Sequence, residues 1–129
     1  MNKILVEVSV GELLDKISIL EIKQEKIKDP EKLKFMNDEH TILKDQLNNN
    51  VKSDEKLNNL FQSLKDINAK LWVIEDDKRL CEKNSDFTEN FIKLSRDIHF
   101  LNDDRAKIKL VMNNHTGSKM KEIKEYTSY

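Results

Sequence analysis

Charged side chains that could do chemistry are densest between Trp72 and Arg79, where Glu75, Asp76 and Arg79 follow one another closely. Carboxylates on a helix can hold Mg²⁺ through one or two oxygens together with a ligand's phosphate. Glu75 and Arg79 also have the i, i+4 spacing of an ordinary ion pair on a helix. We favour the second interpretation, a solvated helix face, for this run.

A second cluster is Asn102-Asp103-Asp104-Arg105, whose arginine interrupts an otherwise apolar stripe. A charge at a core position must find a partner, since burying it alone is costly. Arg105 could bind an anion, or it could fix the register of the helices through a buried ion pair. We favour the ion pair and predict Glu21 or Glu25 as the partner.

Glu12 and Asp15 are three residues apart and would share one face of a helix. All-α nucleotide pyrophosphohydrolases hold Mg²⁺ with acids at this spacing, but they use two such motifs on successive helices, and the second is missing here. The sequence also has no Gly-rich phosphate loop and no metal-type Cys/His spacing. We therefore expect no metal and no cofactor.

Four stretches must position these residues, each with a stripe of side chains at steps of three and four, the spacing of one helix face. The stripes are apolar except at Gln24, His40 and Arg105. The stripes are Val10, Leu13, Ile17, Leu20 and Ile27; Leu33, Met36, Leu43 and Leu47; Leu57, Leu60, Leu64, Ile67, Leu71 and Ile74; and Phe91, Leu94, Ile98, Leu101, Ile108 and Met112. Helix starts are indicated by Ser9, Asp29-Pro30 and Ser53, and ends by asparagines near 50 and 84 and by Gly117.

These signals predict a single all-α domain, residues 1–129, built as an antiparallel bundle of two coiled-coil-like helical hairpins. Residues 10–50 form the first hairpin and 53–116 the longer second one. Residues 3–8 alternate as a short strand or extended arm, and residues 117–129 form a polar tail. The longer hairpin should overhang the shorter and expose apolar side chains, namely Trp72, Leu80, Phe87 and Phe91. We therefore predict a homodimer.

Composition narrows the function classes. Charged residues make up 36% of the chain, yet the net charge is −1 and no basic stripe is present, so a nucleic-acid partner is not expected. No apolar run approaches the length of a membrane span or a signal-peptide core, so we expect no membrane partner and a cytoplasmic location. Cys81 is the single cysteine, which rules out a disulfide within the chain.

Three segments carry a resemblance to a known family. They are Val6-Glu7-Val8-Ser9-Val10-Gly11-Glu12-Leu13-Leu14-Asp15-Lys16-Ile17, Leu71-Trp72 with Ile74-Glu75-Asp76, and Asn102-Asp103 with Arg105-Ala106. With them the chain resembles a small bacterial family of unknown function over nearly its whole length. The resemblance implies no activity and no set of site residues.

Two functions stay open at this point. The favoured one is a helical interaction or oligomerisation module without enzymatic activity. The alternative is a Mg²⁺-dependent enzyme acting on a small phosphorylated or anionic metabolite, so a small anionic ligand is also a candidate partner. The polar residues on which either function would depend are Glu21, Glu75, Asp76, Arg79, Asp103 and Arg105.

Overall fold

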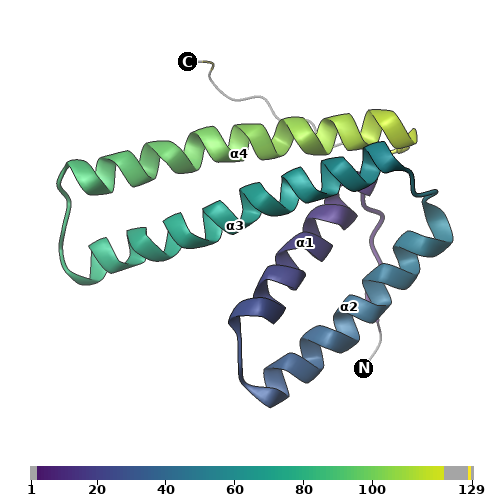
Figure 1. Ribbon diagram of the computed structural model, residues 1–129, viewed down its shortest axis with the longest axis horizontal. Coiled ribbons are helices and arrows are strands. Elements are labelled where there is room, and N and C mark those ends of the chain that lie inside the picture. Colours follow the sequence, from purple (N-terminus) through teal and green to yellow (C-terminus); the bar gives the residue numbers. More distant parts are fainter. Residues whose placement is uncertain (1–2, 121–127, 129) are drawn as a thin grey trace.

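The computed structural model describes residues 3–120 and residue 128. Four helices follow one another in this part of the chain: α1 (Val10–Lys26), α2 (Pro30–Asn50), α3 (Glu55–Lys83) and α4 (Glu89–Thr116). They form two antiparallel hairpins of unequal length, as the apolar stripes predict, and no strand occurs among the described residues (Figure 1). The fold is all-α. Most of the predicted polar tail lies outside the described residues.

Side-chain caps explain where three of the helices begin. The Ser9 hydroxyl accepts from the Glu12 amide at 3.0 Å, and a carboxylate oxygen of Asp29 accepts from Glu31. The third helix is capped by Asp54, which accepts from the amide of Leu57, and not by the predicted Ser53. Each cap supplies a partner to an amide that has none within the helix. At the other end of the chain, Gly117 terminates α4 in the left-handed conformation.

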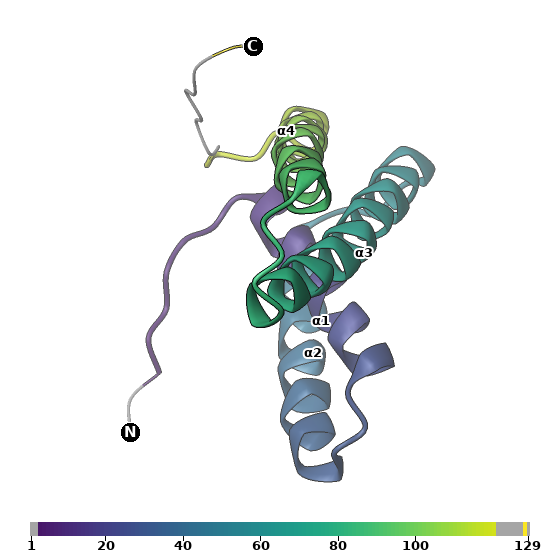
Figure 2. The same ribbon diagram turned by 90° about the vertical axis from the view of Figure 1, so that its left-hand side faces the viewer.

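Helix α1 holds the two hairpins together. It packs against α2, α3 and α4, whereas α2 packs on α1 and reaches the core around Leu57 only at its C-terminal end, through Leu47 and Val51. Leu14 of α1 meets Leu64 and Met112 of the long hairpin in the main buried cluster. The short hairpin slants away from the long one, so the bundle is splayed and not a set of four aligned helices (Figures 1 and 2).

Gly11 sets how closely α1 approaches α4. A Cβ atom at this position would lie 2.7 Å from the carbonyl oxygen of Lys109, a distance that real Cβ atoms do not tolerate. The Gly11 amide instead donates to Oδ1 of Asn113 at 2.7 Å, which gives a buried N–H of the first turn its partner. The missing side chain therefore brings the start of α1 directly onto the second half of α4.

Three segments of the chain have few buried residues. In α2, Met36 is the only buried residue. Of the described residues between Trp72 and Leu101, Cys81 alone is buried. Residues 3–9 are extended and form no strand, and the side chains of Ile4 and Leu5 are each 89% exposed. The predicted strand or arm is therefore an arm in the described structure.

Candidate functional site

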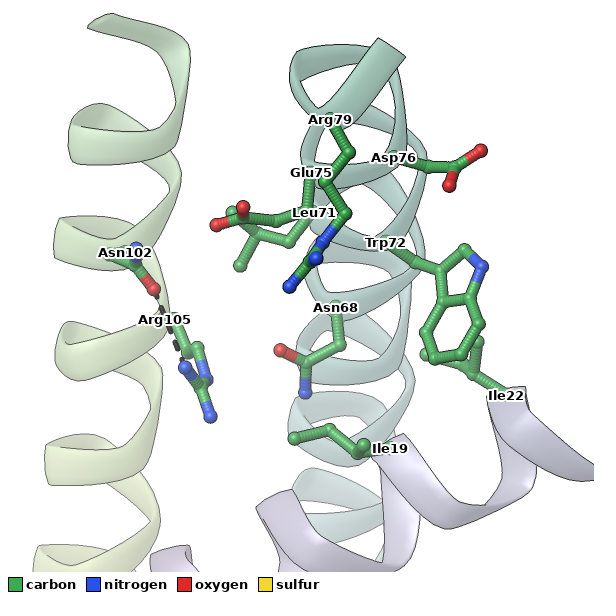
Figure 3. Close-up of a pocket in the computed structure, with 10 residues that line it drawn as sticks. All are labelled: Ile19, Ile22, Asn68, Leu71, Trp72, Glu75, Asp76, Arg79, Asn102 and Arg105. Atoms are coloured by element: carbon green, nitrogen blue, oxygen red, sulfur yellow. Dashed lines mark hydrogen bonds between the residues drawn. The ribbon is translucent and has the colours of Figure 1, made fainter. Parts of the chain in front are cut away.

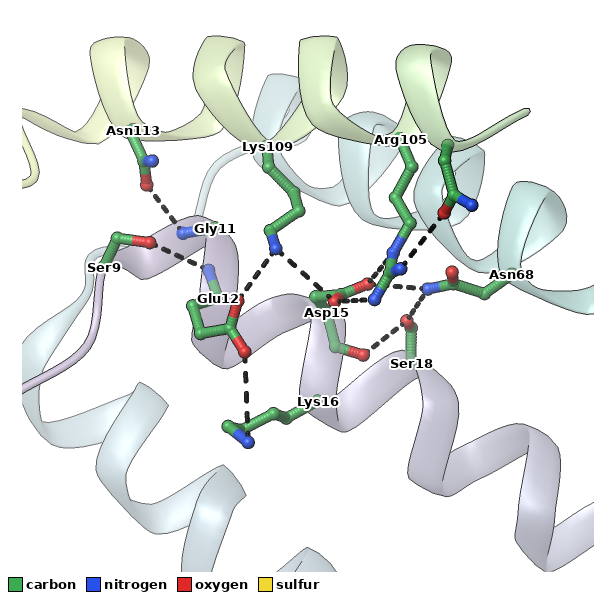
Figure 4. Close-up of polar contacts among 11 residues, drawn as sticks. Ser9, Gly11, Glu12, Asp15, Lys16, Ser18, Asn68, Arg105, Lys109 and Asn113 are labelled. Carbon is green, nitrogen blue, oxygen red and sulfur yellow. Dashed lines mark hydrogen bonds and ion pairs between the residues drawn. The ribbon is translucent and has the colours of Figure 1, made fainter. Parts of the chain in front are cut away.

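The centre of the polar interior is the carboxylate of Asp15, a buried residue on α1. Arg105 of α4 reaches it with two nitrogens: Nε donates to Oδ1 at 3.0 Å and Nη2 donates to Oδ2 (Figure 4). Asn68 of α3 donates to Oδ1 at 2.8 Å. Three helices thus meet on one carboxylate, and a two-pronged arginine contact fixes their relative orientation.

The predicted partner of Arg105 is wrong. Glu21 accepts from Lys65 at 3.4 Å and lies 3.0 Å from the ring nitrogen of His40, and Glu25 accepts from Lys65 at 3.0 Å. The reason is the slant of α1: its first half lies against α4, while its second half faces α3 and α2. Arg105 does make a buried ion pair that aligns the helices, but with a carboxylate of the first half.

Neighbouring side chains extend this centre. Lys109 donates to Oε2 of Glu12 at 2.8 Å and lies 3.5 Å from Oδ2 of Asp15. The Ser18 hydroxyl accepts from Nδ2 of Asn68 at 2.8 Å. We call this set the Asp15 network, comprising Glu12, Asp15, Ser18, Asn68, Arg105 and Lys109. Two acids and two bases compensate one another, so the network carries little net charge.

Burial by itself would raise the pKa of Asp15. Hydrogen bonds from Arg105 and Asn68, together with the positive charges of Arg105 and Lys109, outweigh that effect and hold the pKa below its usual value of 3.8. The carboxylate is therefore ionised near neutral pH with its oxygens committed to donors. Such a group orients helices well but is poorly suited to accept a proton from a substrate.

An open groove with a volume of about 440 Å³ lies beside the network, between α1, α3 and α4 (Figure 3). We call it the Trp72 groove. It is lined by Ile19, Ile22, Asn68, Leu71, Trp72, Glu75, Asp76, Arg79, Asn102 and Arg105. Asn68 and Arg105 belong both to the groove and to the Asp15 network, so the network fixes the position of one end of the groove.

The groove brings together four of the six polar residues predicted from sequence: Glu75, Asp76, Arg79 and Arg105. Glu21 and Asp103 do not line it. Trp72, predicted to be exposed on the overhang, is half-buried and lies beside Ile22 in this groove (Figure 3). Across the described ranges, no group of three His, Cys, Asp or Glu residues is placed to hold a metal ion.

Sequence reasoning missed Asn68, Ser18 and Lys109, whereas it named Asn102 in the cluster that contains Arg105. Signals for two of them were present. Asn68 stands four residues after Leu64 and three before Leu71, which is helical spacing for a polar residue facing the core. Lys109 follows Arg105 by four residues and Asp15 follows Glu12 by three, so each pair shares one face of its own helix.

A family model described as a family of unknown function matches residues 4–129. Neither the curated proteins nor the solved structures contain a significant match to the chain. Within residues 3–120, no helix combines the length and the hydrophobicity needed to cross a membrane. Residues from all three segments that carry the resemblance, Asp15, Trp72 and Arg105 among them, meet at the Asp15 network and the adjoining groove.

Proposed function

The chain belongs to DUF6165, a family of unknown function, and we propose that it is a helical interaction module that joins two copies through the loop end of its long hairpin. The loop end comprises residues 80–92, between the last turn of α3 and the first turn of α4. The proposal places the module in the cytoplasm, where a lone thiol such as that of Cys81 stays reduced.

The observation that supports this proposal most directly is that burial decreases along the contact between α3 and α4, here called the seam. Leu64 and Met112 are fully buried where α1 covers the seam. Farther out, Leu94 and Ile98 occupy the same stripe but are only half-buried. Two helices alone leave two flanks of their seam open to water. The outer half of the hairpin thus lacks the covering layer that a bundle normally supplies.

Apolar side chains gather at this uncovered end. Leu80, Phe87 and Ile92 are each about half exposed, at 49%, 56% and 54%. Phe87 packs edge-on against Phe91, with ring centroids 5.5 Å apart, and Nζ of Lys78 lies 5.3 Å from the Phe91 centroid. Aromatic side chains in such a position are typical anchors of protein interfaces.

A second copy fits this end better than an unrelated partner. The loop end has three acids, Glu82, Asp86 and Glu89, and one base, Lys83, and it is flanked by the basic residues Lys78, Arg79 and Lys93. Acids and bases are therefore mixed over this end, so two identical ends can meet without a large like-charge repulsion. A two-fold arrangement is closed and uses the same patch twice. Two hairpin ends placed together would also give each seam the helical cover that it lacks.

Sedimentation equilibrium tests the proposal. We expect a dimer at micromolar concentration and a dissociation constant raised by about tenfold or more in Phe87→Ser, because interface aromatics commonly contribute over ~1.4 kcal/mol. Phe35→Ser is the matched control. Phe35 lies on α2 and is 78% exposed, so its loss should leave the dissociation constant unchanged.

A parent protein that stays monomeric throughout the micromolar range would refute self-association. A dimer weakened by Phe35→Ser but not by Phe87→Ser would place the interface on the short hairpin and would also overturn the proposal. Circular dichroism on both variants checks that each remains helical.

A further inference from the structure

The Trp72 groove holds polar groups that have no partner in the described part of the chain. Asn68 is 5% exposed and gives its Nδ2 to Asp15 and Ser18, but no donor reaches its Oδ1. That oxygen points into the space between α3 and α4 (Figure 3). The guanidinium of Arg79 lies next to the same space. No fully buried side-chain nitrogen or oxygen among the described residues lacks a partner, so this oxygen is open to solvent within the groove and can accept from a ligand.

The charges around the groove argue against a free anion as that partner. Arg105 is compensated by Asp15, which leaves Arg79 as the one arginine of the groove without an ion pair among the described residues. Glu75 and Asp76 line the same groove and are equally without a cationic partner there. A phosphate group or an isolated carboxylate would meet two negative side chains for one positive one.

Two neutral amides, Asn68 and Asn102, lie on the α4 side of the groove beside Arg105, whose charge Asp15 compensates. Asn68 offers a solvent-accessible carbonyl oxygen, and Asn102 offers its Nδ2, since its Oδ1 accepts from Arg105 at 3.4 Å. Hydroxyl groups match this pair, because each can donate to one amide and accept from another. A carboxylate would face the Asn68 oxygen, and an ammonium group would face the Arg105 guanidinium.

The remaining walls are apolar. The indole of Trp72 and the side chain of Ile22 lie together on the side of α3 that faces away from α4, whereas Leu71 lies on the α4 side and Ile19 lies below Asn68 (Figure 3). A flat aromatic face beside carboxylates, amides and an arginine suits a ring that has C–H groups on its faces and hydroxyls around its edge. The volume of about 440 Å³ falls within the range of small-molecule sites.

We propose that the Trp72 groove binds a neutral polyhydroxylated ligand of the chemical class of a monosaccharide. Asn68 and Asn102 pair with hydroxyls on the α4 side, Glu75 and Arg79 pair with others at the open edge, and Trp72 covers one face of the ring. This binding site is separate from the loop end and does not depend on self-association.

Trp72 is the only tryptophan in the chain, so its fluorescence reports directly on the groove. The protein would be titrated with D-glucose, D-galactose, D-mannose and N-acetyl-D-glucosamine, and in parallel with inorganic phosphate and with glycine. Saturable changes in emission are expected for at least one sugar, with weaker or no response to phosphate and glycine. Calorimetry with the same probes checks the fluorescence.

Three variants locate the binding. Arg79→Ala should weaken sugar binding about tenfold, as expected when one charge-assisted hydrogen bond is lost. Arg96→Ala is the matched control, because Arg96 lies over Phe100 and does not line the groove. Glu75→Gln should keep most of the affinity, since an amide still hydrogen-bonds to a hydroxyl but no longer attracts a cation.

The absence of binding by every sugar at millimolar concentration overturns the proposal. Tighter binding of phosphate or of glycine than of any sugar overturns the neutral class in favour of an anion or a zwitterion. Sugar binding that Arg79→Ala leaves unchanged overturns the assignment to this groove.

Discussion

Arg105 occupies a core position of α4 and directs its guanidinium at the buried carboxylate of Asp15. We predict that Arg105→Ala lowers the free energy of unfolding by about 3–5 kcal/mol, because it leaves Asp15 charged, buried and short of donors. Denaturation in urea measures the loss. Arg96→Ala serves as the control, since Arg96 is exposed and should change stability by less than about 0.5 kcal/mol.

A second variant, measured in the same way, separates the contribution of the Arg105 charge to stability from the contribution of its side-chain packing. Arg105→Met keeps the aliphatic bulk but removes the charge, so it should destabilise nearly as much as alanine does. A Met variant as stable as the parent would mean that Asp15 is adequately served by Lys109 and Asn68, contrary to our interpretation.

Asp15 also predicts how stability depends on pH. Its pKa is lower in the folded chain than the usual 3.8, so the unfolded chain takes up a proton at higher pH than the folded one does. The stabilisation from Asp15 is therefore complete above about pH 5 and is lost as pH falls through about 4 and on through the folded-state pKa. Urea denaturation from about pH 6 to about pH 2 should show this decline.

The variant Asp15→Asn should flatten that decline, whereas Asp38→Asn, at an exposed site on α2, should not. Some slope will persist in both. The pKa of Asp54 is lowered by the hydrogen bond from the Leu57 amide and by His115, and the pKa of Asp86 is lowered by Thr88. An unchanged slope in Asp15→Asn would contradict the role assigned to this carboxylate.

Arg105 shows which features of the site could be predicted from the sequence and which could not. Arg105 stood out because it breaks an apolar stripe, and its role in a buried ion pair followed from the cost of burying charge. Its partner did not follow, because the choice between Asp15, Glu21 and Glu25 depends on the angle between two helices. Periodicity along one helix contains no information about that angle.

Helix α2 is the least anchored element of the fold. Met36 is its only buried residue, and the neighbouring Phe35 is 78% exposed. We predict that Met36→Ala costs about 2–5 kcal/mol in free energy of unfolding while Phe35→Ala costs less than about 0.5 kcal/mol. Urea denaturation of these two adjacent variants checks the side of α2 that faces α1. Similar losses in both would show that α2 packs differently.

The four helices could be predicted closely from sequence because residues near each helix end determine where it begins or stops. Asp29-Pro30 starts α2, and the asparagines at positions 48–50 form its last turn, so both boundaries follow from backbone preferences that act within a few residues. Unequal hairpin lengths followed from the same boundaries. The error at Ser53 was a choice between two adjacent capping residues, where either side chain could accept from the first turn of α3.

At the scale of the whole molecule, the splay between the hairpins decides where the functional surfaces lie. It places the first half of α1 against α4, opens the Trp72 groove and leaves the loop end uncovered. The uncovered end followed from the unequal hairpin lengths, but the groove and the contact of α1 with α4 were not predictable from the register within each hairpin. The position of Gly11 decides it in part, because a side chain there would force α1 away from Lys109.

The Asp15 network also bears on the order in which the protein can assemble during synthesis. Asp15 leaves the ribosome early, but its two cationic partners, Arg105 and Lys109, lie 90 or more positions later in the chain. Until α4 emerges from the ribosome, the carboxylate of Asp15 lacks its cationic partners and the apolar side chains of α1 lack part of the surface against which they pack. The first hairpin to be translated is therefore the last to be secured, and the nascent chain relies on its final helix to close the fold.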